Sequence, residues 1–186
     1  MSRTYIKLFA GILIISGIGI VILFGFRSEI LNIPGSSSKQ GVYPAAPNVD
    51  SPAPSFTLNS LSGEQISLEQ YTGRPLMINF WATWCGPCRL EMPLFQSYQE
   101  KYGTEFTILA VNVGETETEV QAFVDQLSLD FDILMDKNGE VESLYRIRGY
   151  PSTYFVDEDG KIRILHLGIM SESQLLGYLE ELGIIQ

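Results

Sequence analysis

Apolar positions along this chain form continuous runs typical of buried strands, separated by stretches with helical spacing. Leu76 to Trp81 is apolar except for Asn79, which indicates a strand buried on both faces. Thr107 to Val113 has the same character and predicts a second buried strand. Residues 86–102, between these runs, carry apolar side chains at the spacing of a helix, namely Leu90, Leu94, Phe95 and Tyr98.

The remainder of the chain after residue 55 predicts a short hairpin and further alternation of helices and strands. The predicted elements are a hairpin of strands at 56–58 and 65–67 around Leu61, Ser62 and Gly63, a helix at 117–127 with Val120, Phe123, Val124 and Leu127 facing inward, a strand at 131–135, a helical turn or two at 141–145, a hairpin of strands at 153–156 and 162–167, and a last helix. Ser171 opens that helix, and Gln174 completes a capping box with it. The order predicts an α/β domain whose mixed central sheet has a parallel middle, antiparallel edges and helices on both faces.

Leu8 to Phe26 is an uncharged apolar run that predicts a transmembrane helix. As a helix it would be about 28 Å long, close to the thickness of the hydrocarbon core of a bilayer. One alternative is a cleaved signal peptide, but its apolar core usually spans only about 7–15 residues, and no small-residue cleavage pattern follows directly. A buried core helix is the other alternative, and the lack of any polar face argues against it.

Flanking charge predicts the orientation of this anchor and the domain boundaries. Arg3, Lys7 and the free amino terminus precede the run, whereas Arg27 and Glu29 after it cancel. The positive-inside bias therefore predicts a single-pass cell-membrane protein whose residues 1–7 are cytoplasmic and whose remainder is exported. Residues 27–55 are rich in Pro, Gly, Ser and Ala and predict an extracytoplasmic linker, and residues 56–186 predict the folded domain.

The exported part is strongly acidic. Nine of the twelve basic residues and all 22 acidic residues follow residue 27, which gives that part a net charge of −13. Such a surface repels nucleic acid and anionic lipid headgroups, so no nucleic-acid partner is expected and the domain should stand off the bilayer. The need for solubility alone explains the acidity equally well.

Cys85 and Cys88 are the only cysteines and form one C-x-x-C, so no structural disulfide is expected. They follow a predicted buried strand and open a predicted helix. Unpaired N–H groups and partial positive charge at a helix N-terminus lower a thiol pKa from about 8.5 toward 7 or below. This context predicts Cys85 as the attacking thiol and Cys88, one turn inside, as the resolving thiol, with Pro87 tolerated in the first turn.

A C-x-x-C can also be half of a zinc site. Zinc requires four ligands, or three ligands and water, and the chain offers only His166 besides the two cysteines. We therefore expect no metal and no cofactor, and a structural role for His166.

The segment from Phe80 to Cys88, with a helix after it, and the segment from Gly149 to Thr153, before a strand, resemble the thioredoxin superfamily. Within it the chain is most similar to the membrane-anchored ResA/TlpA-type thiol–disulfide oxidoreductases. The resemblance covers the chain from Pro54 to the C-terminus. It implies a thioredoxin-like fold with an extra N-terminal β-hairpin, and it matches Cys85 and Cys88 to the redox pair.

Further site residues carry over from this resemblance one by one. Pro151 matches a cis-proline that lies beside the disulfide and helps to hold an extended substrate; the alternative is an ordinary trans-proline. Pro93 matches a structural proline in the active-site helix. Glu91 matches an acidic residue that could exchange protons with the thiols if its pKa were raised by burial; the alternative is a solvated helix carboxylate. Asn79 occupies the position at which thioredoxins proper carry a buried aspartate.

The surroundings of the cysteines complete the expected site. Trp84, Gly86, Pro87 and Tyr150 are the expected substrate contacts together with Pro151, whereas Trp81 is expected in the core. Some ResA-type proteins carry Glu where this chain has Gly86. Gly-Pro is the thioredoxin dipeptide, and thioredoxin's potential of about −270 mV favours a reductase.

The resemblance implies a reductase of protein disulfides, with apocytochrome c as the suggested substrate and a membrane thiol carrier as the electron donor. Other activities stay open at this point. They are a disulfide oxidase or isomerase, a general extracytoplasmic reductase, and a non-enzymatic binding module for unfolded chains. A peroxidase would rely on a differently placed cysteine.

Overall fold

Two buried strands form the centre of the sheet in the computed structural model, which describes residues 47–185. These strands, β3 (Leu76–Trp81) and β4 (Thr107–Val113), are parallel, and β5 (Asp132–Asp136) continues the parallel set beside β4. Antiparallel strands complete the edges: β1 (Thr57–Ser60), β2 (Gln65–Ser67), β6 (Ser152–Val156) and β7 (Ile162–Leu167). The sheet order is β2-β1-β5-β4-β3-β6-β7, which confirms the predicted mixed sheet.

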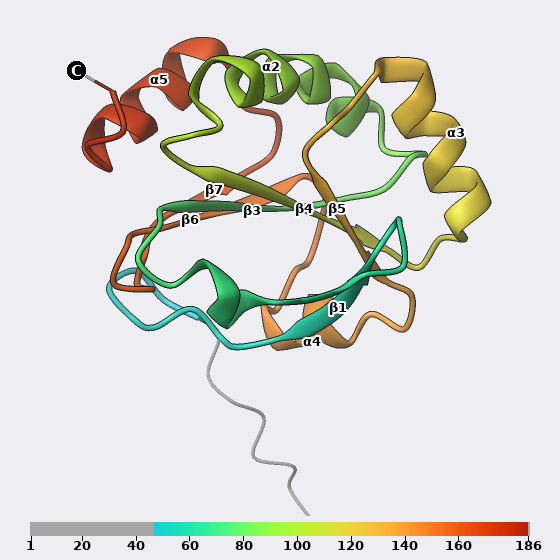
Figure 1. The fold of residues 1–186 in the computed structure, drawn as a ribbon, viewed down its shortest axis with the longest axis horizontal. Helices are drawn as coiled ribbons and strands as arrows, with labels where there is room; N and C mark the ends of the chain where they lie inside the picture. Colours follow the sequence, from blue (N-terminus) through green and yellow to red (C-terminus); the bar gives the residue numbers. More distant parts are fainter. Residues whose placement is uncertain (1–46, 186) are drawn as a thin grey trace, which may run out of the picture. The chain divides into compact units, whose positions relative to one another are not determined.

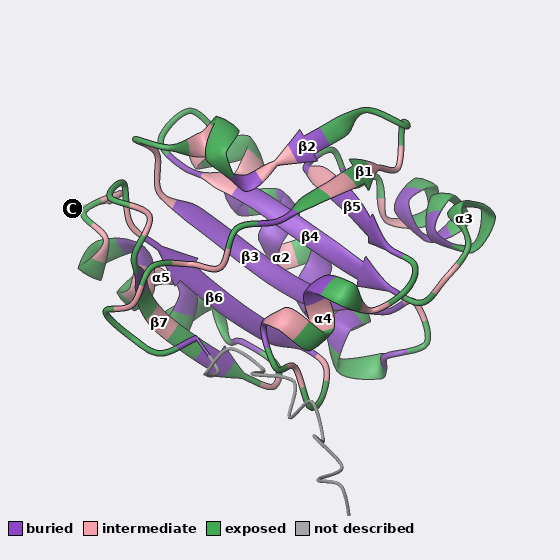
Figure 2. Cartoon of the chain, turned by 90° about the horizontal axis from the view of Figure 1, so that it is seen from below, coloured by how far each residue is buried: buried purple, intermediate pink, exposed green. Residues whose placement is uncertain are grey.

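Helices cover both faces of this sheet (Figure 1). On one face lie α2 (Gly86–Tyr102), α3 (Glu117–Leu127) and α5 (Glu172–Glu181), and on the other lie α4 (Glu140–Leu144) and the 3₁₀ turn η1 (Leu68–Tyr71). Every residue of β3 is buried as a result, and Figure 2 shows the central strands buried along their length. A strand covered on both faces needs apolar side chains at every position, which explains its unbroken apolar run.

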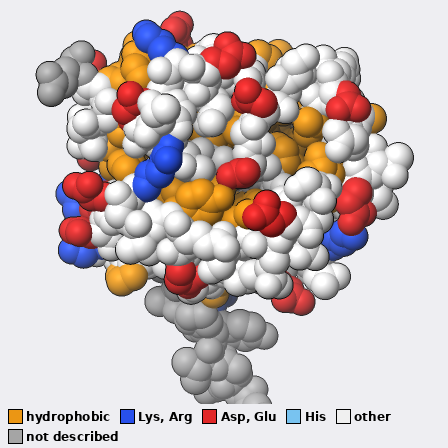
Figure 3. All heavy atoms as spheres, in the orientation of Figure 1, with side chains coloured by type: hydrophobic (Ala, Val, Ile, Leu, Met, Phe, Trp, Pro, Cys, Tyr) orange, Lys and Arg blue, Asp and Glu red, His pale blue; other side chains and the backbone are white. Residues whose placement is uncertain are grey.

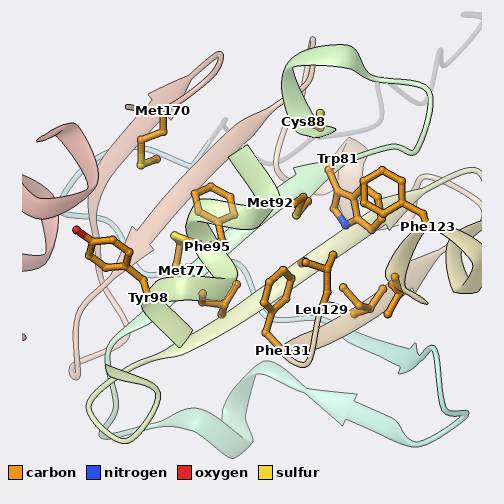
Figure 4. Packing of buried hydrophobic residues seen from close by; sticks show 14 of the residues in the cluster. Met77, Trp81, Cys88, Met92, Phe95, Tyr98, Phe123, Leu129, Phe131 and Met170 are labelled. Atoms are coloured by element: carbon orange, nitrogen blue, oxygen red, sulfur yellow. The ribbon is translucent and has the colours of Figure 1, made fainter. Parts of the chain in front are cut away.

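Two apolar clusters separate along β3 because successive side chains of a strand point to opposite faces. Met77 and Trp81 join the cluster under α2, α3 and α5, whereas Ile78 and Phe80 join the cluster on the α4 side. Figure 4 shows Trp81 beside Phe123 in the first cluster, with the ring centroids 4.8 Å apart. Trp81 is fully buried, as predicted, and holds the end of β3 just before the cysteine motif.

The elements predicted after residue 55 all form, with boundaries that shift by one or two residues. The N-terminal hairpin pairs Leu58 with Ile66 and extends the sheet by pairing β1 with β5. Ser171 caps α5, and its capping box with Gln174 is confirmed. The expected helical turn near residues 141–145 and the strand near 131–135 appear as α4 and β5.

One of the apolar residues whose spacing predicted α2 does not face the core. Leu90 is 73% exposed, and the inward positions of the helix are instead Cys88, Glu91, Met92, Phe95, Gln96 and Tyr98. Cys88 and Phe95 set the phase of the buried face, and Leu90, two residues after Cys88, lies about 200° around the helix from it. Spacing alone could not choose between the two faces because the sequence carries apolar residues on both.

Part of the predicted linker packs on the domain. The backbone of Asp50 donates to Ile162 O, that of Ala53 donates to Gly160 O, and Pro52 bridges to Lys161. The contacts of the folded domain therefore begin before Phe56. The predicted cytoplasmic N-terminus, the anchor at 8–26 and the linker up to residue 46 lie outside the described residues.

Between residues 47 and 185, no helix is long and apolar enough to cross a bilayer. Acidic side chains outnumber basic ones on the face shown in Figure 3, in keeping with the acidity of the sequence.

We expect Phe95→Ala to lower the free energy of unfolding by about 3–5 kcal/mol, because it opens a cavity in the cluster beneath α2. Equilibrium urea unfolding of the oxidised protein measures this change. Leu90→Ala is the matched control on the same helix, and its effect should stay within about 0.5 kcal/mol since the side chain faces solvent. Equal losses in the two variants would contradict the helix orientation.

Candidate active site

The two cysteines lie at the junction between β3 and α2. Cys85 is the N-cap residue of α2, and its Sγ accepts a hydrogen bond from the backbone N–H of Cys88 at 3.2 Å. The two residues form a disulfide, with Cα atoms 5.3 Å apart. The sequence expectation that this pair stands at a helix N-terminus is therefore met by the geometry.

The first turn of α2 favours negative charge on Cys85 once the disulfide is reduced. Its backbone N–H groups point toward the N-cap, and the seventeen-residue helix places partial positive charge there. No acidic side chain lies in this first turn, so nothing on it opposes a thiolate. Pro87 occupies the first turn without loss of a helical hydrogen bond.

Only one sulfur-bearing residue of the pair reaches the surface. Cys85 is 5% exposed and Cys88 is fully buried. Cys85 lines an open groove of about 510 Å³, whose other lining residues come from the start of α2, from α4 and from the loops beside them: Trp84, Gly86, Pro87, Glu142, Ile147, Arg148, Gly149 and Tyr150. A small exposed area suffices for exchange, because the attacking sulfur needs access along one direction only, and the groove supplies it.

Four of the predicted substrate contacts, Trp84, Gly86, Pro87 and Tyr150, line this groove together with Cys85. The Tyr150–Pro151 peptide bond is cis, as predicted. Trp84 is 70% exposed and meets Tyr150 edge to face, with ring centroids 5.7 Å apart. The Tyr150 hydroxyl donates to Glu142, and burial together with this bond raises the pKa of the phenol, so it remains a donor at neutral pH. Tyr150 also lines a neighbouring groove, and that groove, not the one at Cys85, is lined by the buried Pro151.

Glu91 is buried on the inner face of α2, one turn beyond Cys88. Its side chain is 1% exposed, which rules out the alternative of a solvated carboxylate. Glu91 Oε1 accepts from Asn79 Nδ2 at 3.1 Å, and Oε2 accepts from the backbone N–H of Met170 at 3.2 Å. Burial raises the pKa of Glu91 to about 7, although these two hydrogen bonds oppose the rise. A carboxyl with this pKa can accept or release a proton at neutral pH.

A second carboxylate, which sequence reasoning missed, fixes the loop before Cys85. Glu115 accepts the backbone N–H of Thr83 at 2.7 Å and Asn112 Nδ2 at 2.7 Å, and it also accepts the Thr83 hydroxyl. These bonds tie the loop after β3 to the loop after β4. No local pattern marked Glu115, because its partners come from two separate segments.

The remaining residues singled out by the sequence are structural. His166 Nδ1 lies 3.0 Å from the Tyr178 hydroxyl and Nε2 lies 3.2 Å from the Ile169 carbonyl oxygen. Pro93 lies inside α2.

Among residues 47–185, no three His, Cys, Asp or Glu side chains gather where they could hold a metal ion.

Glu91 should make the stability of the oxidised protein fall as pH rises from about 4.5 to 7. Its folded pKa of about 7 exceeds the ordinary 4.5, so the folded state keeps a proton that the unfolded state has released. The stabilisation is complete below pH 4.5 and is lost as pH rises through 7, a change of about 3 kcal/mol.

The variant Glu91→Gln removes this titration. We therefore expect the free energy of unfolding of the variant, relative to that of the native protein, to rise by about 3 kcal/mol between pH 4 and 8. Urea unfolding at a series of pH values measures it. Met92→Leu, a neutral change on the same turn, should run parallel to the native protein. Parallel curves for Glu91→Gln as well would show that Glu91 does not titrate in this range.

Comparison with known proteins agrees with this site. The sequence model of the AhpC/TSA family matches residues 49–164. Thioredoxin-like protein YneN of Bacillus subtilis is 37% identical over 87% of this chain and 93% of its own length. Thiol-disulfide oxidoreductase ResA of Oceanobacillus iheyensis is 41% identical over 70% of this chain and 71% of its own length.

A similar solved structure is that of a putative thiol:disulfide interchange protein DsbE from Chlorobium tepidum. It superposes with a TM-score of 0.66 at 30% identity and covers 72% of this chain and 99% of its own. The chain therefore belongs to the AhpC/TSA family and is a thiol–disulfide oxidoreductase with a thioredoxin-like fold.

Proposed function

We propose that this oxidoreductase is tethered to the cell membrane and reduces protein disulfides outside the cytoplasm, with apocytochrome c as substrate. The observation that carries the proposal is the asymmetry of the first turn of α2. Cys85 faces an open groove at the helix N-terminus, and Cys88 is buried one turn before a carboxyl whose pKa is about 7.

The reaction begins with the reduced enzyme. The Cys85 thiolate attacks one sulfur of the substrate disulfide, forming a mixed disulfide, and the other substrate sulfur leaves as a thiolate that takes a proton from water. Cys88 then gives its proton to the Glu91 carboxylate and attacks Cys85 Sγ. The second substrate sulfur leaves as a thiolate that takes a proton from water, and the Cys85–Cys88 disulfide forms, so two electrons pass from enzyme to substrate. A membrane dithiol carrier restores the dithiol by the reverse exchange.

The direction toward reduction rests on the dipeptide between the cysteines. Gly86 and Pro87 reproduce the thioredoxin pair, whose potential of about −270 mV lies at the reducing end of this fold's range. A measured potential near −120 mV would instead identify a disulfide-forming oxidase.

An extended polypeptide fits the surface beside the cysteines. Trp84 and Tyr150 give the Cys85 groove aromatic walls, and a neighbouring groove of about 710 Å³ continues past the cis peptide at Pro151. Extended segments are what unfolded apocytochrome c presents around its C-x-x-C-H thiols. The relatives named ResA support a protein disulfide as the substrate.

Membrane tethering rests on the apolar run from Leu8 to Phe26. The Bacillus subtilis relative matches 87% of this chain, more than residues 47–186 can supply, so the similarity reaches into the N-terminal segment. The tether would keep the acidic domain near its membrane electron donor and would take no part in the exchange itself. Removing the tether should therefore leave the exchange chemistry of the isolated domain unchanged.

The trapping variant Cys88→Ala should accumulate mixed disulfides through Cys85, because no resolving thiol remains. We expect non-reducing electrophoresis and mass spectrometry of cells of the source organism to recover c-type apocytochromes on it. The double variant Cys85→Ala/Cys88→Ala is the matched control and should trap nothing. Recovery of a broad set of exported proteins without c-type apocytochromes would contradict the substrate assignment.

The anchor has its own test. The full chain should remain in the membrane pellet after alkaline carbonate extraction, and protease added outside intact spheroplasts should digest the domain. Deletion of residues 2–26 should release the protein into the cytoplasmic fraction. A protease-resistant full chain, or one shortened at its N-terminus and freely secreted, would contradict the proposed topology.

A further inference from the structure

A buried amide lies between the sheet and the carboxyl of α2. Asn79, at the centre of β3, is completely buried, and its Nδ2 donates both to Glu91 Oε1 at 3.1 Å and to Thr153 Oγ1 at 2.9 Å. Asn79 and Thr153 are directly paired across β3 and β6. Asn79 thus binds the Glu91 carboxyl and is itself held by Thr153 of the neighbouring strand β6.

The hydrogen bonds around Glu91 are those of an ionised carboxylate. Both of its oxygens accept N–H donors, one from Asn79 and one from the Met170 backbone. A protonated carboxyl would have to direct its own O–H at one of these donors or turn away from it. Donors aimed at the charged form favour that form, so the Asn79 amide opposes the effect of burial.

The other end of the same amide is left without a partner. Asn79 Oδ1 is buried and has no hydrogen-bond partner, although an apolar residue of similar size would leave no such atom in the core. A buried unpaired acceptor is unfavourable and marks a residue retained for something other than packing. The function that the amide serves at this cost in stability is to donate an N–H to the Glu91 carboxylate.

From these contacts we infer that Asn79, oriented by Thr153, is a positioning residue that holds the Glu91 carboxylate in its ionised, proton-accepting form beside Cys88. The inference deepens the proposed function and rests on it, because the proton comes from Cys88 during resolution of the mixed disulfide. Neither Asn79 nor Thr153 touches the reacting sulfurs through any described hydrogen bond; both act through Glu91.

None of the other titratable groups on the surrounding elements forms a described hydrogen bond with the Glu91 carboxylate. Besides Cys88 on α2 itself, they are His166 on β7 and Glu172 and Tyr178 on α5. His166 lies opposite Thr153, but its ring nitrogens face Tyr178 and the Ile169 carbonyl. Glu172 faces Tyr98. The packed strand β3 carries no ionisable side chain, and Tyr154 of β6 points to the opposite face.

The decisive experiment follows the resolving step in single turnover, with the reduced full-length protein mixed with a peptide disulfide, quenched in acid and alkylated. We expect Asn79→Leu to move the pH midpoint of resolution upward by about one unit from near 7, slowing it about fivefold at pH 7 and sparing it above pH 9. Titration of the Glu91 carboxyl carbon by NMR in the oxidised protein should show the same shift without relying on activity.

Three further single variants and one double variant separate positioning from a merely structural effect. Thr153→Val should shift the midpoint in the same direction as Asn79→Leu, whereas Thr153→Ser, which keeps the hydroxyl, should restore the native value. Asn112→Leu is the matched control, because Asn112 is also buried with an unpartnered Oδ1 and donates to a glutamate, Glu115. Its overall rate is not the readout, since Asn112 helps to hold the loop before Cys85 through Glu115. Its pH midpoint, which Glu91 sets, should not move. In a Glu91→Gln background, Asn79→Leu should produce no further shift.

The outcomes distinguish this inference from the proposed function. An unmoved NMR and kinetic midpoint in Asn79→Leu, with Glu91→Gln still slowing resolution, would overturn the inference alone. A shift that persists in the Glu91→Gln background would also overturn it, since the effect would not pass through Glu91. If Glu91→Gln left resolution unchanged, both the proton step and the inference would fail. Should Asn79→Leu not fold, the Thr153→Val and Thr153→Ser pair decides in the same way.

Discussion

The first two turns of α2 have to place Cys85 and Glu91 under opposite electrostatic conditions, although only six residues separate them. Cys85 needs the partial positive charge and the opening at the helix N-terminus, where a thiolate is stabilised and can be reached. Glu91 needs burial, because only desolvation brings its pKa to about 7. A helix that begins at the edge of the sheet and runs across its face meets both conditions.

The remaining structure keeps that helix start in place. Parallel β3 and β4 end at the same edge of the sheet, and Glu115 joins the loops that follow them. Trp81 and Phe123 fill the space beneath these loops. Tyr150, which precedes Pro151 through a cis peptide bond, lies against Trp84. The groove is therefore built from rigid neighbours of the disulfide and not from a separate domain.

Sequence patterns predicted the elements that depend on local physics. The runs that became β3 and β4 are apolar at nearly every position because both sheet faces are covered, and the cap at Ser171 is a three-residue signal. The placement of the C-x-x-C at a helix N-terminus followed from the strand and helix predicted around it, and α2 begins there. The role expected for Glu91 came from the resemblance to ResA/TlpA-type proteins, and the burial of its carboxyl is compatible with that role.

Features that depend on partners distant in sequence could not be predicted in the same way. Asn79 is visible as the one polar residue in a buried run, but its bonds to Glu91 and Thr153 join positions 12 and 74 residues away. Glu115 and the packing of residues 50–53 against the β6–β7 hairpin likewise arise only in three dimensions. Leu90 contributes to the helical spacing of apolar residues and yet is exposed, because that spacing does not reveal which side of a helix meets the sheet.

The stabilised thiolate at the N-terminus of α2 is the centre of this account, and its titration is the most direct test. The rate at which iodoacetamide modifies Cys85 in the fully reduced protein can be measured against pH, with the modified residue identified by mass spectrometry. The account predicts a midpoint at about 7 or below. A midpoint at about 8.5 or above, the range of an ordinary cysteine, would contradict it.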